Sequence, residues 1–148
     1  MTATAVVGFG QVQRVTVHFD DLDAIGIVHN AKYAVLVERA LSAYWSARGH
    51  SFQDGQPTTS DVVHAVREFS ITYHAPIRGT GDLDVHFWVE RLGESSAVYR
   101  FRFLSPNRAT VYAEGRRVVV KLDLATGRPA PWTPHGREVA AALLRDPG

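Results

Sequence analysis

The fold is decided by residues 17–45, VHFDDLDAIGIVHNAKYAVLVERALSAYW, in which a strand-like pattern gives way to a long helical one. From Asn30 onward, apolar residues recur at three- and four-residue steps, which is the period of an amphipathic helix. Asn30 is a good N-cap and Gly49 is a stop signal, so the sequence predicts a helix over 30–48. Between the strand and the helix lies an acidic loop that contains Asp20, Asp21 and Asp23.

The helix is predicted to be wrapped by other structure. Its apolar arc is wide and is formed by Tyr33, Val37, Ala40, Leu41, Tyr44 and Ala47. A helix that lies on a surface needs a narrower apolar stripe, so this one should be covered on more than one side. Upstream, residues 11–19 alternate as a first strand whose mostly apolar face includes Val15, Val17 and Phe19.

The chain beyond the turn-rich loop at 49–61 is dominated by period-two alternation, which predicts four more strands. One face of the second strand is expected to carry Val63, Ala65, Phe69, Ile71 and Tyr73. The last three strands are separated by turns of hairpin length and should form an antiparallel meander, and a short helix over 134–145 closes the chain. The predicted fold is α+β, with a curled antiparallel five-stranded sheet wrapped around one long central helix in a single domain over 1–148. This is the hot-dog architecture.

The composition is that of a globular domain with few special features. The chain has 148 residues, of which 45% are hydrophobic, and a formal net charge of +1. That balance does not favour a nucleic-acid partner, and no apolar run is long enough for a membrane span. There is no cysteine, which excludes thiolate chemistry and disulfides. Because the N-terminus also lacks the pattern of a signal peptide, we expect a cytoplasmic protein.

Two stretches carry a family resemblance. The segment FDDLDAIGIVHNAKYAVLVERA, residues 19–40, resembles the signature of the 4-hydroxybenzoyl-CoA thioesterase family and its acyl-CoA thioesterase relatives. The matching residues are Asp21, Asp23, Gly26, Val28, Tyr33 and Glu38. A second segment, ITYHAPIRGTGDLDV at 71–85, is similar to the family's strand-turn-strand segment in Tyr73, Pro76, Arg78, Gly81 and Asp82. The resemblance implies an acyl-CoA or acyl-carrier-protein thioesterase.

Thioester hydrolysis needs a base or nucleophile and a group that stabilises the oxyanion. Asp23 precedes the predicted helix start by a loop that can fold its carboxylate back toward free backbone N–H groups. The resemblance assigns Asp23 the role of nucleophile or general base and places the oxyanion donor at the Asn30 N–H. Substrate contacts are expected at Gly26, Val28, Tyr33, Glu38 and Arg78. The alternative is that Asp23 only forms a turn, as Asp and Gly commonly do.

Two other residues compete for a catalytic role. His29 is next to Asn30 and could orient a water or the carboxylate, although a histidine at a helix start is more typical of a cap. Glu38 lies on the border of the apolar arc, where another branch of hot-dog thioesterases carries its catalytic acid. A salt bridge explains Glu38 equally well. Some relatives carry Tyr at the position of Phe19 and His at that of Asn30, so these auxiliary groups are missing here.

Other kinds of site find less support. The seven histidines show no short ligand spacing on one helix face, so no metal and no cofactor is expected. Basic residues gather in the strand region and are candidates for phosphate contacts, namely Arg78, Arg91, Arg100, Arg102, Arg116, Arg117, Lys121 and Arg128. An uncovered sheet edge predicts pairing between subunits, and the resemblance implies a homodimer or homotetramer. The alternative function is a non-catalytic domain that binds or senses acyl thioesters, because the fold alone does not fix chemistry.

Overall fold

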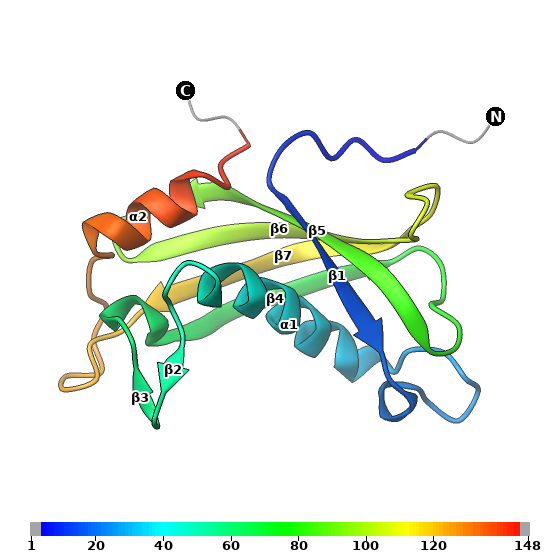
Figure 1. Ribbon diagram of the computed structural model, residues 1–148, viewed down its shortest axis with the longest axis horizontal. Coiled ribbons are helices and arrows are strands. Elements are labelled where there is room, and N and C mark those ends of the chain that lie inside the picture. Colours follow the sequence, from blue (N-terminus) through cyan, green and yellow to red (C-terminus); the bar gives the residue numbers. More distant parts are fainter. Residues whose placement is uncertain (1–3, 146–148) are drawn as a thin grey trace.

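A five-stranded antiparallel sheet curls around the helix α1 (Tyr33–Ser46) in the computed structural model, which describes residues 4–145 (Figure 1). The strands lie in the order β1-β5-β6-β7-β4, where β1 is Gln11–Val17, β4 His64–Tyr73, β5 Gly81–Leu92, β6 Ser96–Leu104 and β7 Val111–Lys121. Smaller elements are η1 (Phe19–Asp21), η2 (Asn30–Lys32), β2 (Phe52–Gln53), β3 (Gln56–Pro57), η3 (Ser60–Val62) and α2 (Pro134–Ala141). The predicted α+β hot-dog architecture is confirmed.

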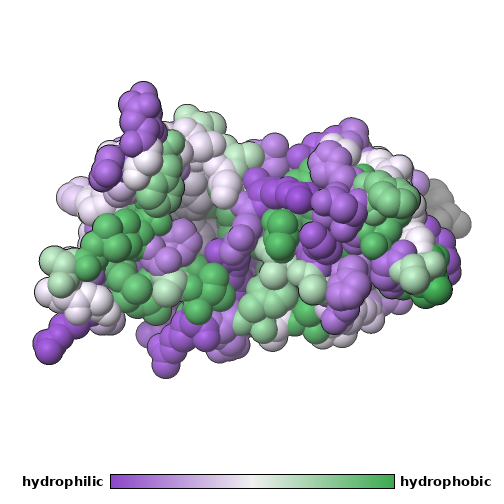
Figure 2. Space-filling view, turned by 90° about the horizontal axis from the view of Figure 1, so that it is seen from below, coloured by the Kyte–Doolittle hydropathy of each residue, from purple (hydrophilic) through white to green (hydrophobic). Residues whose placement is uncertain are grey.

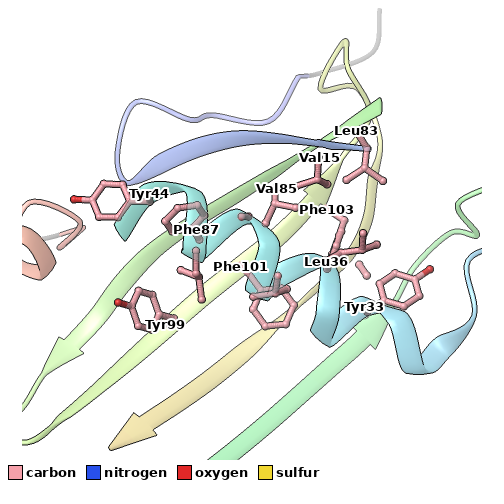
Figure 3. Close-up of a cluster of buried hydrophobic side chains, with 14 of the residues drawn as sticks. Val15, Tyr33, Leu36, Tyr44, Leu83, Val85, Phe87, Tyr99, Phe101 and Phe103 are labelled. Atoms are coloured by element: carbon pink, nitrogen blue, oxygen red, sulfur yellow. The ribbon is translucent and has the colours of Figure 1, made fainter. Parts of the chain in front are cut away.

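The apolar arc of α1 fills the concave side of the sheet, as its width predicts. Leu36, Val37 and Ala40 are fully buried in the core. Leu36 faces aromatic rings that rise from β5 and β6 (Figure 3). The ring of Tyr44 lies 5.8 Å from that of Phe87 in an edge-to-face arrangement. Burial of each large apolar side chain contributes about 1.5–3 kcal/mol. The packing therefore fixes where both ends of α1 lie relative to the sheet.

Several element ends differ from the prediction. The residues at 30–32 form the 3₁₀ turn η2, and α1 itself ends at Ser46, two residues short of the predicted stop. The first strand ends at Val17 because η1 begins at once, and Phe19 is 85% exposed instead of facing the core. The last helix stops at Ala141. The loop after α1 contains the small β2–β3 hairpin, which the alternation did not indicate.

One predicted strand face is wrong. In β4 the pairing with β7 shifts between Val66 and Glu68, which is a β-bulge at Arg67. A bulge inserts an extra residue, so the side-chain alternation changes phase across it. Phe69 and Ile71 pack against the core, whereas Ala65 is opposite Val120 and lies on the other face. The prediction treated the alternation of side chains as uninterrupted along the strand, whereas the bulge at Arg67 interrupts it.

The convex face of the sheet is partly covered by the segment that precedes β1. The ring of Phe9 lies 4.8 Å from His86 and 5.1 Å from Trp88, both in edge-on contacts. Its carbonyl oxygen also hydrogen-bonds His86 Nε2 at 2.7 Å. Gly10 has φ +66° and lies so close to the Phe87 carbonyl that a Cβ would collide with it, so only glycine fits there. Among residues 4–145, no further strand pairs with the outer edges of β1 and β4.

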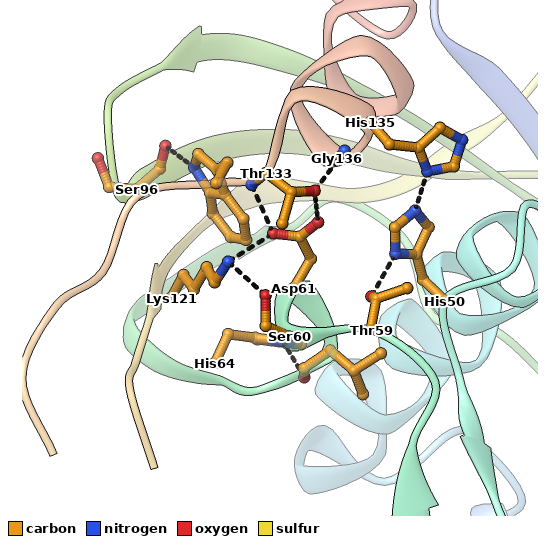
Figure 4. Close-up of polar contacts among 12 residues, drawn as sticks. His50, Thr59, Ser60, Asp61, His64, Ser96, Lys121, Thr133, His135 and Gly136 are labelled. Carbon is orange, nitrogen blue, oxygen red and sulfur yellow. Dashed lines mark hydrogen bonds and ion pairs between the residues drawn. The ribbon is translucent and has the colours of Figure 1, made fainter. Parts of the chain in front are cut away.

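A buried polar network holds the segment between α1 and β4 against α2 (Figure 4). The Asp61 carboxylate accepts hydrogen bonds from Lys121 Nζ at 2.8 Å and from the hydroxyl and backbone N–H of Thr133. His50 bridges Thr59 at 2.7 Å and His135 at 3.1 Å. Lys121 is therefore a buried structural cation and is unavailable to a phosphate. Within residues 4–145, no helix has the length and apolar character that crossing a membrane requires.

Candidate active site

The acidic loop is anchored by Asp21, which is 0% exposed. Its Oδ2 accepts a hydrogen bond from the His18 N–H at 2.8 Å and another from Arg39 Nη1 at 3.3 Å. Burial raises the pKa of Asp21, but the His18 and Arg39 bonds outweigh it and hold the pKa below its usual value. Asp21 is therefore an ionised structural group that ties the loop to α1.

Asp23 is held by one of its two carboxylate oxygens. Its Oδ1 accepts hydrogen bonds from the backbone N–H of Ile25 at 2.9 Å and of Ile27 at 3.4 Å. Gly26 adopts φ +80° in this turn, the left-handed conformation expected of it from the sequence. Oδ2 of Asp23 accepts no hydrogen bond from residues 4–145. The turn thus orients the carboxylate and leaves one oxygen free.

The start of the helix supplies a backbone donor. His29 is the N-cap of η2, and its Nδ1 accepts a hydrogen bond from the Ala31 N–H at 3.0 Å, as expected of a capping histidine. Asn30 follows on the exposed surface, and its N–H meets no acceptor within the described part of the chain. Free N–H groups at a helix start carry partial positive charge and attract a developing anion.

The second motif folds against the first. The Val28 N–H donates to the Ile77 carbonyl at 2.9 Å, and the Gly79 N–H donates to the Gly26 carbonyl at 2.9 Å. Between them, Ile27 and Arg78 form an isolated antiparallel bridge. Two stretches that are far apart in the sequence therefore build one corner of the molecule, and Arg78 is exposed at that corner.

Tyr33 lies behind this corner and not on its surface. It is buried, with its ring 5.0 Å from that of Tyr73 and 5.1 Å from that of Phe103. Tyr73 is half exposed, and its hydroxyl donates to the Asn30 carbonyl at a long 3.5 Å. Within one chain Tyr33 is thus a core residue that packs against the half-exposed ring of Tyr73.

Glu38 belongs to a different place. Its carboxylate accepts a hydrogen bond from Arg117 Nη1 at 3.1 Å and is 53% exposed. It lies at the mouth of a cavity of about 760 Å³ that follows the second half of α1. Asp23, Gly26, Val28 and Arg78 are thus brought together, whereas Glu38 is separated from them and engaged in the ion pair that the sequence left as an alternative.

The sequence reasoning did not single out Arg117 or Tyr99, both of which line that cavity. Arg117 was one of the basic residues expected to be candidates for phosphate contacts, but it is buried and pairs with Glu38 on α1. The sequence did contain a signal for this position of Arg117. Side chains along β7 alternate between the two faces of the sheet, and the inward positions include Ala113, Arg117, Val119 and Lys121. Among residues 4–145, no group of three or more His, Cys, Asp or Glu residues is placed to hold a metal ion.

Comparison with known proteins identifies the family. Residues 25–120 match the family described as the thioesterase superfamily. The chain belongs to the thioesterase superfamily. It is a thioester hydrolase, as the resemblance implied. The acyl-CoA thioester hydrolase YbgC of Escherichia coli O6:H1 is 28% identical over 109 residues, which cover 74% of this thioesterase and 79% of that protein.

Solved structures of related proteins have the same fold as this chain. A thioesterase from Thermus thermophilus, complexed with coenzyme A and Zn, is 30% identical with a TM-score of 0.75, over 96% of this thioesterase and 100% of that chain. The PA5185 protein from Pseudomonas aeruginosa superimposes with a TM-score of 0.81 at 26% identity, and 92% of each chain is covered. The curled sheet around α1 is thus shared with thioesterases of known structure.

Proposed function

We propose that this thioesterase hydrolyses acyl-CoA thioesters, with Asp23 as the catalytic carboxylate and the Asn30 N–H as the oxyanion donor. Coenzyme A is favoured over an acyl carrier protein by the name of the Escherichia coli relative and by the coenzyme A in the Thermus thermophilus structure. The observation that carries the assignment is the asymmetry of Asp23, whose Oδ1 is fixed by two N–H groups while Oδ2 is free.

The chemistry needs only these groups and a water. The thioester carbonyl oxygen accepts from the Asn30 N–H, which stabilises the charge that develops as the carbonyl carbon is attacked. Asp23 Oδ2 either attacks directly, giving an acyl anhydride that water then cleaves, or removes a proton from the attacking water. In both routes the C–S bond breaks, the thiolate takes up a proton, and the products are a carboxylic acid and a free thiol.

The surrounding residues support this role. Because His29 Nδ1 accepts from Ala31, the Nε2 of its neutral ring carries the proton and can orient the water or the Asp23 carboxylate. Gly26 forms the turn of the loop, whereas Val28 is buried in the core and makes no contact with a ligand on the surface, contrary to the expectation from the sequence. The exposed Arg78 offers a cation to a phosphate of coenzyme A.

The working unit is proposed to be a homodimer or homotetramer. Strand β4 is an open edge of ten residues, and Val66 and Tyr73 on it are half exposed. An edge of this length invites pairing with the same strand of a second copy, which extends the sheet across a twofold axis.

The proposal is tested by assaying thiol release from a panel of aromatic, branched and straight-chain acyl-CoA thioesters and from an acyl-carrier-protein thioester. Turnover of at least one acyl-CoA is expected. If the chain binds acyl-CoA but hydrolyses no member of the panel, the alternative function holds, namely a non-catalytic domain that binds or senses acyl thioesters.

A further inference from the structure

The cavity along the second half of α1 is a second feature of the molecule with ligand-binding character. Its helical wall is formed by Glu38, Leu41, Ser42 and Trp45, and its sheet wall by Tyr99, Arg117 and Val119. Its volume of about 760 Å³ is in the range of small-molecule sites. Apolar side chains gather on the end of the molecule that carries β2 and β3, as seen from below in Figure 2. The cavity combines apolar side chains with polar and charged ones, among them Glu38, Arg39, Tyr99 and Arg117.

Two buried donors in the sheet wall have unused hydrogen-bonding capacity. The Arg117 side chain is 6% exposed and has five N–H bonds, but only Nη1 has a partner, Glu38, and Nε has none among residues 4–145. The buried Tyr99 hydroxyl accepts from Trp45 Nε1 at 3.0 Å, and its own proton meets no acceptor in the described chain. Buried donors without acceptors are costly and rare.

The two donors belong to the same wall of the cavity. Tyr99 and Arg117 are direct cross-strand partners on β6 and β7, so their side chains leave the sheet side by side on its concave face. Burial raises the pKa of Tyr99, so its hydroxyl keeps its proton. Burial also lowers the pKa of His64, the neighbouring histidine in the wall, which favours its neutral form.

The charge in the cavity selects the kind of acceptor. Arg117 is already paired with the Glu38 carboxylate, so a second carboxylate beside Glu38 would be repelled. A neutral oxygen, a hydroxyl or a ketone, accepts from Tyr99 and Arg117 without that repulsion. A hydroxyl has the further advantage that its own proton can be donated to Glu38.

The geometry points to Arg117 and Tyr99 as specificity-determining residues that bind a hydroxyl or keto oxygen on the acyl group, remote from the thioester. This inference rests on the proposed acyl-CoA hydrolase function. The cavity adjoins the acidic loop because Arg39, which lines it, donates to Asp21. Glu38 follows Asn30 by eight residues, which corresponds to about 12 Å along a helix axis. The far end of an acyl chain, and not the reacting carbonyl, therefore belongs in this cavity.

The experiment uses two coenzyme A thioethers that cannot be hydrolysed, S-octyl-coenzyme A and its ω-hydroxy derivative. Their dissociation constants are measured by calorimetry, and kcat/KM is measured for the matching thioesters. The wild-type chain should bind the hydroxylated analogue about ten- to a hundredfold more tightly, since hydrogen bonds to charged groups have effects of that size. The same preference should appear in kcat/KM.

Two variants and a control locate the effect. Arg117→Met and Tyr99→Phe should each reduce the preference by at least about fivefold while binding of S-octyl-coenzyme A is kept. Tyr99→Phe removes one oxygen only, so it gives the answer if Arg117→Met does not fold. Arg116→Met is the matched control, because Arg116 adjoins Arg117 on β7 but pairs with Glu68 on the convex face. It should keep the full preference.

The outcomes separate the two proposals. Hydrolysis of both thioesters without any preference for the oxygenated chain leaves the thioesterase proposal standing and overturns the assignment of Arg117 and Tyr99. A preference that survives in both variants overturns it as well. If neither analogue binds and neither thioester is cleaved, the acyl-CoA function and the inference built on it are both wrong.

Discussion

Glu38 on α1 accepts a hydrogen bond from Nη1 of Arg117 on β7 at 3.1 Å, so the carboxylate on the helix is already paired with a buried cation. Asp23, in contrast, has no cationic partner among residues 4–145, and only backbone N–H groups donate to it. A carboxylate that attacks a carbonyl or accepts a proton while it is held in an ion pair gives up part of its attraction to the cation, which raises the barrier. This difference favours Asp23 over Glu38 for the chemical step.

Replacing Asp23 by Asn should lower kcat by about 10²- to 10⁴-fold, the usual effect of removing an acid–base group. Asn keeps the side-chain oxygen that accepts from Ile25 and Ile27, so the turn should survive. Dissociation constants of the coenzyme A thioethers should change little, and urea unfolding should show a stability near that of the wild type. Near-normal turnover by Asp23→Asn would move the catalytic role elsewhere.

The Glu38→Gln variant should keep at least about a tenth of the wild-type kcat on unsubstituted acyl-CoA substrates. This is well above the kcat expected after the loss of a catalytic acid–base group. Gln keeps an oxygen that can accept from Arg117 and removes only the charge. The measurement is a side-by-side kinetic comparison with Asp23→Asn. If Glu38→Gln abolishes turnover and Asp23→Asn does not, the catalytic carboxylate lies on the helix.

The sequence predicts the central packing well because periodicity is a local signal. The inward residues of α1, such as Leu36 and Val37, and those of β5 and β6 are where alternation and helical spacing place them. The face of β4 was predicted wrongly because the bulge at Arg67 shifts the phase, and nothing in the residue types announces a bulge. Phe19 was assigned to the mostly apolar face of the first strand, but the strand ends at Val17 and leaves Phe19 exposed.

In the candidate site too, the features that depend on local sequence could be predicted and those that depend on tertiary packing could not. The turn at Asp23 and Gly26 could be predicted, since both residues have strong local preferences. The partners of Glu38 and Lys121 could not, because Arg117 and Asp61 are far from them in the sequence and are selected by tertiary packing. The family resemblance suggests the role of a residue, but it does not identify the oppositely charged residue that pairs with it.

The open edge at β4 predicts that a charge added there weakens self-association. Ser70→Glu places the same charge on both copies of the paired strands, and like charges across strands are destabilising. The dimer dissociation constant should rise about three- to thirtyfold in sedimentation equilibrium, given two such repulsions of a few tenths of a kcal/mol to about 1 kcal/mol each. Thr110→Glu, an exposed site between β6 and β7, is the control and should leave association unchanged. A wild-type chain that is monomeric at micromolar concentration contradicts the proposed assembly.

His86 makes the fold sensitive to acid. It is fully buried on the convex side of β5, where Nε2 donates to the Phe9 carbonyl at 2.7 Å and Nδ1 accepts from Arg102 at 2.6 Å. Burial, the largest cause, lowers the pKa of His86 from 6.5 to about 4, and the charges of Arg102, Arg108 and Arg145 act in the same direction. The folded chain therefore keeps His86 neutral at pH values where the unfolded chain already binds a proton.

The free energy of unfolding should consequently fall as the pH drops from 6.5 toward 4, by a total of about 3 kcal/mol from His86 alone. Above pH 6.5 this contribution of His86 to stability should be complete. Urea unfolding of the wild type at pH 7.5, 6, 5 and about 4 measures this loss. His86→Gln offers both an N–H for Phe9 and an oxygen for Arg102 but does not titrate, so its unfolding free energy should depend less steeply on pH in this window. The smaller slope that remains is expected from His50 and His64, whose pKa values burial also lowers. Parallel pH profiles for the wild type and His86→Gln would show that His86 is not the acid-sensitive group.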